Sequence, residues 1–133
     1  MPYRVLEHTA DIGIEATAPD IPALFSEAVR ATAAVILDAE PPAGANDDPV
    51  AVDADDVETL LAELLTEALW RFESTGALPV AAELEVSGTT AAGTFQTVLA
   101  VSLGGPAIKA VTYHQLSVER IGDEWRARVY FDV

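Results

Sequence analysis

The sequence predicts an α+β fold, in which a mixed or antiparallel β-sheet carries two main helices in a single domain spanning residues 1–133. Two segments, within about 20–37 and 55–76, repeat apolar residues at helical spacing. From Val80 onward, apolar and polar residues alternate with a period of two, which is typical of strands. Because these strands follow one another without intervening helices, the order favours α+β over a parallel α/β sheet. A length of 133 residues suits one domain.

Two strands are expected near the N-terminus, over residues 3–8 and 11–18. In the second strand, one parity holds the apolar residues Ile12, Ile14 and Ala16. Successive side chains of a strand point to opposite faces, so these residues would enter the core. Asp11 would then stand on the solvent side, where the strand begins.

Helix boundaries can be predicted from capping residues. Asp20 precedes a helix start that has a proline in its first turn, and the apolar stripe continues to about Leu37. The second helix would be capped by Asp55 or Asp56 and end near Gly76, a typical C-terminal glycine. Its leucine stripe favours packing on a sheet, with a partner-binding face as the alternative.

The remaining segments are read from turn residues and alternation. Three prolines, a glycine and several acids predict a loop over residues 38–49, followed by a short strand at 50–52. A turn at 88–93 separates two alternating strands, and the strand at 108–121 changes apolar parity near His114. Such a change predicts a β-bulge. The last strand is expected over residues 125–133.

Composition limits the classes of function. The chain has 22 acidic and 7 basic residues, giving a net charge of −15. Because nucleic-acid affinity depends on basic groups that neutralise phosphates, we expect no strong direct binding to RNA or DNA. A basic protein partner or a cation fits better, with solubility or adaptation to salt as the alternative. The absence of cysteine excludes disulfides and thiolate sites. No apolar run reaches membrane-spanning length and no signal-peptide core is present, so a cytoplasmic protein is expected.

Carboxylates occur at both ends of the predicted fold. Asp132 lies on the polar parity of the last strand, and Val133 ends the sequence with an α-carboxylate. If strands from the two ends are neighbours, these groups could converge with Asp11. Such a cluster would need a cation, and oxygen ligands suit calcium or magnesium. The alternative is that Asp11 caps a turn and Asp132 pairs with Arg126 or Arg128.

Three further residues could take part in chemistry. His8 and His114 are the only histidines, and they could form a proton-transfer pair or simply bond backbone carbonyls. Lys109, beside a glycine-proline segment, could contact phosphate. The sequence contains no phosphate-binding glycine loop, dinucleotide-binding fingerprint or nucleophile elbow.

Three segments together resemble the archease family across essentially the whole chain. They are His-Thr-Ala-Asp-Ile-Gly-Ile at 8–14, Lys-Ala-Val-Thr-Tyr-His at 109–114, and Arg-Val-Tyr-Phe-Asp-Val at 128–133. The resemblance implies a small α+β protein, not itself an enzyme, that assists the GTP-dependent RNA ligase of the RtcB type in tRNA splicing. It implies promotion of the guanylylation and turnover of that ligase, and a chaperone-like role has also been attached to the family.

The resemblance also implies a calcium site, or a site for a similar cation, formed by Asp11, Asp132 and Val133. Lys109, His114 and His8 are then candidate contacts to the ligase or its nucleotide. Two alternatives stay open. One is a metal-dependent phosphoester hydrolase that uses the two aspartates with a histidine, and the other is a general protein chaperone.

Overall fold

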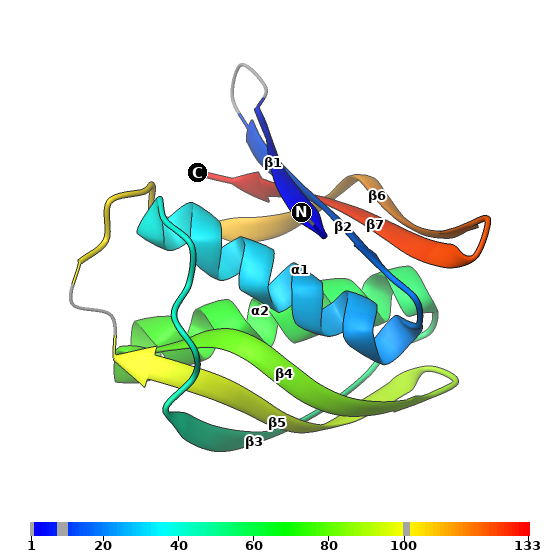
Figure 1. Ribbon diagram of the computed structural model, residues 1–133, viewed down its shortest axis with the longest axis horizontal. Helices are drawn as coiled ribbons and strands as arrows, with labels where there is room; N and C mark the ends of the chain where they lie inside the picture. Colours follow the sequence, from blue (N-terminus) through cyan, green and yellow to red (C-terminus); the bar gives the residue numbers. More distant parts are fainter. Residues whose placement is uncertain (1, 8–10, 100–101) are drawn as a thin grey trace.

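Two helices lie between two antiparallel sheets in the computed structural model (Figure 1), which describes residues 2–7, 11–99 and 102–133. The elements in chain order are β1 (Tyr3–Glu7), β2 (Asp11–Ala18), α1 (Ile21–Leu37), β3 (Asn46–Asp53), α2 (Val57–Thr75), β4 (Ala77–Ser87), β5 (Thr90–Leu99), β6 (Ala110–Ile121) and β7 (Glu124–Asp132). The α+β class predicted from the sequence is confirmed.

The strands divide into two sheets, where the sequence suggested one. The first sheet has the order β1-β2-β7-β6, and the second has the order β3-β5-β4. All neighbouring strands are antiparallel. Helix α1 contacts β2 and β4, and α2 contacts β6 and β4, so both helices bridge the sheets. The alternation that predicts a strand cannot say which sheet the strand joins.

The helices begin and end where the sequence predicts. The Asp20 carboxylate accepts a hydrogen bond from the Ala23 amide at 2.8 Å. Of the two candidate caps for α2, Asp56 is the one used, because its carboxylate accepts from the Thr59 amide at 2.7 Å. That hydrogen bond lowers the pKa of Asp56. Gly76 ends α2 with a φ of 78°, a conformation that favours glycine.

Two loop predictions were wrong in extent. Residues 46–49 of the expected loop belong to β3, which continues to Asp53. The three prolines and the acids suggested a loop, but β3 is an edge strand, and an edge strand tolerates Pro49. Arg71 on α2 also holds this segment, donating to the Pro49 carbonyl at 2.5 Å. The expected turn at 88–93 is shorter, since β4 ends at Ser87 and β5 starts at Thr90.

The predicted irregularity in β6 is confirmed. The pairing of β6 with β7 shifts register between Thr112 and Ser117. Within this interval Gln115 has a φ of 54°, in the left-handed region. The bulge changes the direction of the side chains on either side of it, including that of His114.

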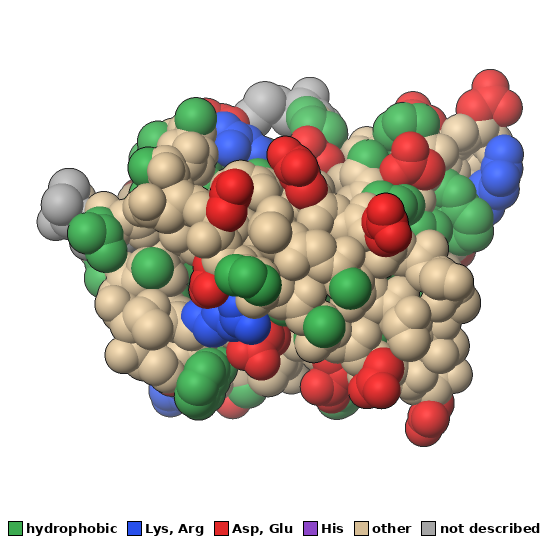
Figure 2. Space-filling model, turned by 90° about the horizontal axis from the view of Figure 1, so that it is seen from below, with side chains coloured by type: hydrophobic (Ala, Val, Ile, Leu, Met, Phe, Trp, Pro, Cys, Tyr) green, Lys and Arg blue, Asp and Glu red, His purple; other side chains and the backbone are tan. Residues whose placement is uncertain are grey.

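The core lies between the layers and is built from the inward parity of the strands and the apolar faces of both helices. Fully buried side chains include Ile14, Phe25, Leu64, Phe95 and Phe131. None of the helices in the described residues is long and apolar enough to cross a membrane. Acidic side chains are scattered over the face of the molecule seen in Figure 2, on the side of the three-stranded sheet.

Candidate functional site

Two carboxylates face each other where β2 begins and β7 ends. In the register of these strands, Asp11 lies directly opposite Asp132. Both have the outward parity of the four-stranded sheet, because their neighbours Ile12 and Phe131 pack with the core. Directly opposed residues of an antiparallel pair have Cβ atoms about 4.5–5.5 Å apart. The convergence of strands from the two ends of the chain, expected from parity, is therefore present for these two residues.

The backbone around Asp132 is held from two sides. Strand β2 pairs with it through Asp11, and Ala110 is its partner on β6. The Lys109 amide also donates to the Asp132 carbonyl at 2.7 Å. Val133 follows directly, and its side chain packs against the core. The end of the chain is thus placed beside the two carboxylates by its hydrogen-bonded neighbours.

The expected alternative, in which an arginine neutralises Asp132, is wrong. Arg126 donates to Glu119 at 2.6 Å, and Arg128 donates to Glu15 at 2.7 Å. In the part of the chain that the structure describes, neither Asp11 nor Asp132 has a side-chain hydrogen bond or an ion pair. Like charges directly opposite each other on a sheet are destabilising. These carboxylates therefore form an uncompensated pair among the described residues.

The donor set suits a hard divalent cation. Carboxylate oxygens are the ligands that calcium and magnesium prefer. Within the described residues, no group of three or more histidine and acidic side chains could hold a metal. Asp11 and Asp132 would therefore need a further donor, and the α-carboxylate of Val133 is the one that the sequence suggests. His8 lies outside the described residues, as does the side chain of Glu7.

Gly13 and Tyr130 form the neighbouring residue pair on the same face as the carboxylates. Gly13 lies opposite Tyr130, and a Cβ at Gly13 would come within 2.6 Å of the Tyr130 ring. The ring occupies this space, so Tyr130 is only 6% exposed although its parity is outward. The His114 ring contacts it edge-on, with centroids 6.3 Å apart. The bulge in β6 thus places His114 over a ring that adjoins the carboxylate pair.

This role of Gly13 and Tyr130 was not predicted from the sequence. Tyr130 has the same parity as Asp132 in the last strand, and this parity predicts a side chain that points to solvent. The available signal was Gly13 itself, because a glycine inside an alternating strand often marks a close approach of another group. Lys109 and His114 are both exposed. Lys109 lies next to the Asp132 backbone, and His114 lies against the Tyr130 ring.

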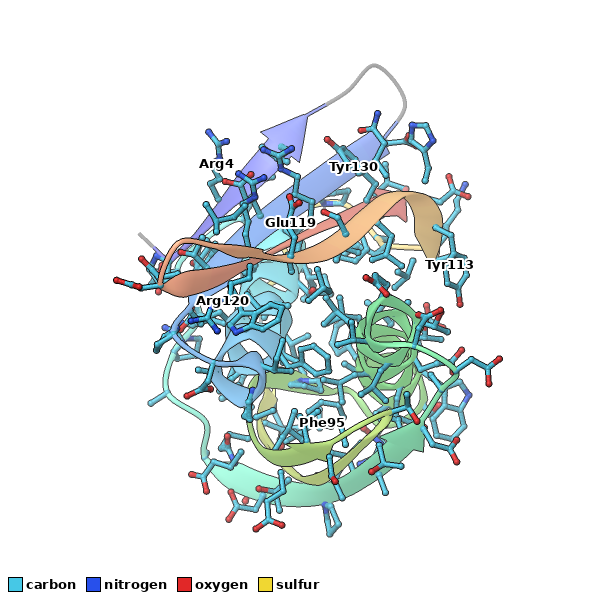
Figure 3. The ribbon with its side chains drawn as sticks, turned by 90° about the vertical axis from the view of Figure 1, so that its right-hand side faces the viewer. Arg4, Phe95, Tyr113, Glu119, Arg120 and Tyr130 are labelled. Atoms are coloured by element: carbon cyan, nitrogen blue, oxygen red, sulfur yellow. The ribbon has the colours of Figure 1, made fainter. Side chains whose placement is uncertain are left out.

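Further along the same face, opposite charges are matched. Glu15 lies between Arg4 on β1 and Arg128 on β7, and it accepts hydrogen bonds from them at 3.1 and 2.7 Å. Burial raises the pKa of Glu15, but these hydrogen bonds outweigh it, and the pKa lies below its ordinary value. Figure 3 shows Arg4, Glu119 and Tyr130 on the side of the sheet that faces away from the helices. This matched cluster contrasts with the unmatched pair at the strand ends.

Comparisons with known proteins place the chain in a family. The model of the Archease protein family (MTH1598/TM1083) matches residues 3–133. "Protein archease" of Methanosarcina mazei is 31% identical, covering 98% of this chain and 95% of that protein. The protein of the same name from Methanosarcina acetivorans is 32% identical over the same shares.

Two solved structures share the fold. The solution structure of Methanobacterium thermoautotrophicum protein 1598 has a TM-score of 0.79 at 23% identity, covering 99% of both chains. The crystal structure of "an archease, possible chaperone" from Thermotoga maritima has a TM-score of 0.67 at 25% identity, covering 96% of this chain and 94% of that one. The chain therefore belongs to the archease family.

Proposed function

We propose that this protein activates a GTP-dependent RNA ligase of the RtcB type, promoting its guanylylation and its multiple turnover in tRNA splicing. Membership of the archease family supports the role of a protein cofactor over that of an enzyme. The observation that carries the proposal is the uncompensated pair of Asp11 and Asp132 on adjacent strands. The acidic surface suits docking on a basic face of the ligase in the cytoplasm.

We propose that Asp11, Asp132 and the α-carboxylate of Val133 hold a calcium ion or another hard divalent cation. When bound, the cation would supply a concentrated positive charge on an acidic surface, where phosphate oxygens of a nucleotide could be attracted. The backbone bonds from β2, Lys109 and β6 hold the backbone that carries these carboxylates before any partner arrives. Lys109 and His114, exposed beside them, would contact the ligase or its nucleotide.

The test uses the purified cognate ligase with GTP and RNA ends, with and without this protein. We expect the protein to increase ligase–GMP formation and the number of ligations per ligase. Asp132→Asn should remove most of this stimulation, because the cation loses a charged ligand. Asp123→Asn is the matched control, because it removes one exposed carboxylate from the turn at the other end of β7. Unchanged guanylylation and turnover with the wild-type protein would contradict the proposal.

A general chaperone is the second candidate, favoured by the description of the Thermotoga relative as a "possible chaperone". It predicts suppression of aggregation for unrelated client proteins, with no dependence on Asp132. A phosphoester hydrolase is less favoured, because two-metal hydrolytic sites use more ligands than this set supplies. Metal-dependent hydrolysis of a panel of phosphoesters, abolished by Asp11→Asn, would support the hydrolase hypothesis.

A further inference from the structure

A groove with two exposed aromatic side chains separates α2 from the start of β6. Trp70 on α2 is 62% exposed and Tyr113 on β6 is 61% exposed. Both line a groove of about 340 Å³, together with Glu63 and Glu73 from α2 and Lys109 and Val111 from the β6 side. In Figure 3, Tyr113 projects from β6 on the side where α2 lies. Large aromatic side chains left in water on both walls of one groove indicate a surface that a ligand covers.

The residues of α2 that line the groove are regularly spaced along the helix. Glu63, Thr66, Trp70 and Glu73 are spaced by three, four and three residues, so they lie along one face of the helix. Glu63 and Glu73 are exposed and have no cationic partner among the described residues. By contrast, Glu67 on the same helix pairs with Arg71 at 3.2 Å. A cation placed on the Trp70 indole would therefore find an unpaired carboxylate one turn away.

We propose that this groove binds an arginine side chain of a basic partner protein. A guanidinium is planar, stacks on aromatic rings and donates to carboxylates in a fixed fork. Aromatic faces and unpaired carboxylates along one groove match both properties. Lys109 contributes the one positive charge that lines the groove within the described residues, against the two glutamates. The overall charge of −15 favours a basic protein segment over a nucleic acid.

Two residues where β6 begins line the groove and also contact the backbone of Asp132. Lys109 lines the groove while its amide bonds the Asp132 carbonyl at 2.7 Å, and Ala110, which pairs with Asp132, also lines it. A segment held in the groove would therefore lie next to the cation site proposed above. The inference rests on the proposed function in one respect only, which is that the arginine belongs to the RNA ligase. The chemistry of the groove is independent of that function.

The first experiment needs no ligase. The Trp70 indole N–H signal is followed by NMR while the peptide acetyl-Gly-Arg-Leu-Arg-Gly-amide is added. We expect a saturable shift, with weaker binding of the lysine analogue and none of the citrulline analogue. Glu63→Gln with Glu73→Gln should weaken binding about tenfold, while the exposed and remote Glu85→Gln should not. Equal shifts with the citrulline peptide, or a shift with GMP in place of the arginine peptide, would overturn the inference.

The second experiment measures the affinity of the ligase for this protein. Trp70→Ala and Tyr113→Ala should each weaken binding about tenfold. Ile121→Ala is the matched control, since Ile121 is 48% exposed at the other end of β6. Stimulation of the ligase by both groove variants at wild-type affinity would refute the arginine contact and leave the proposed function standing. If the wild-type protein fails to stimulate the ligase, the proposed function fails, and the peptide titration still decides the groove.

Discussion

Two charged pairs on the outer face of the same two strands are built in opposite ways. In the middle of β2 and β7, Glu15 lies opposite Arg128, and their side chains are 2.7 Å apart. Four residues further along each strand, beyond Gly13 and Tyr130, Asp11 lies opposite Asp132. The first pair is neutralised within the fold. The second places like charges together, with no neutralising side chain among the residues that the structure describes.

The acidic residues of this face differ in whether an arginine pairs with them. Arg126 and Arg128 of β7 pair with Glu119 and Glu15, and neither forms an ion pair with Asp132. Asp132 lies where the strand ends, on the exposed side of the sheet. A pair that only served stability would gain from an opposite charge at either position. The lack of such a charge among the described residues supports the proposal that Asp11 and Asp132 bind a cation.

The largest expected effect comes from giving the Asp11–Asp132 pair opposite charges, as in the Glu15–Arg128 pair. Asp132→Lys should place opposite charges across the strands and remove one of the proposed calcium ligands. We expect calcium affinity to fall on the order of a hundredfold, because affinity follows the number of charged ligands. Without calcium, the free energy of unfolding should rise by up to about 1 kcal/mol. Thermal unfolding with calcium and with a chelator measures both effects, and a calcium-induced rise in Tm as large as in the wild type would contradict them.

The next largest effect is expected at the contact between Gly13 and Tyr130, which lies between the two pairs. Gly13→Ala would place a Cβ within 2.6 Å of the Tyr130 ring. The displaced ring should lower the free energy of unfolding by about 1–3 kcal/mol, the usual cost of overpacking. Urea unfolding measures this loss. In a Tyr130→Ala background, which leaves space for the added methyl, the same substitution should cost much less, and an equal cost in both backgrounds would exclude the ring contact as the cause.

The matched pair should depend on pH. Because the pKa of Glu15 is lowered in the folded protein, its contribution to stability is present above its ordinary pKa of 4.5. That contribution is lost as the pH falls through the lowered value. Glu15→Gln should therefore cost about 1 kcal/mol at pH 7, a figure that allows for the partial exposure of the arginines. The cost should vanish in more acidic solution. Urea unfolding at pH 7 and pH 3 checks this, and an unchanged cost at pH 3 would point to packing as its origin.

The smallest effect concerns the outermost member of the matched cluster. The Arg4 side chain is 65% exposed, and exposed ion pairs contribute little. Arg4→Ala should lower the free energy of unfolding by less than about 0.5 kcal/mol. Arg128→Ala should cost more, because Arg128 lies closer to Glu15 and is less exposed. Chemical denaturation measures the loss of unfolding free energy in each variant. A larger loss for Arg4→Ala than for Arg128→Ala would contradict the conclusion that Arg128 is the stronger partner of Glu15.

Local patterns in the sequence predict much of this fold. Asp20, Asp56 and Gly76 mark helix ends through bonds within one turn, and parity correctly assigns Asp11 to the outer face. The bulge near His114 could be predicted because it interrupts the alternation of apolar and polar residues along one strand.

Features that depend on partners far along the chain were not predictable in the same way. Glu15 and Arg128 are 113 residues apart, and nothing local marks them as a pair. The burial of Tyr130 depends on the missing side chain of Gly13 on another strand. Residues 46–49 form a strand because β5 pairs with them, although their own composition suggests a loop. The division into two sheets likewise depends on pairing and not on the alternation within each strand.

The most direct test is a calorimetric calcium titration of the wild type beside Asp11→Asn, Asp132→Asn and the control Asp123→Asn. A form extended beyond Val133 by a short tag tests the α-carboxylate in the same experiment. We expect one site in the wild type and the control, weaker binding in the tagged form, and loss of measurable binding in both strand variants. Equal calcium affinity in Asp132→Asn and the wild type would contradict the claim that the facing carboxylates of β2 and β7 are a cation site.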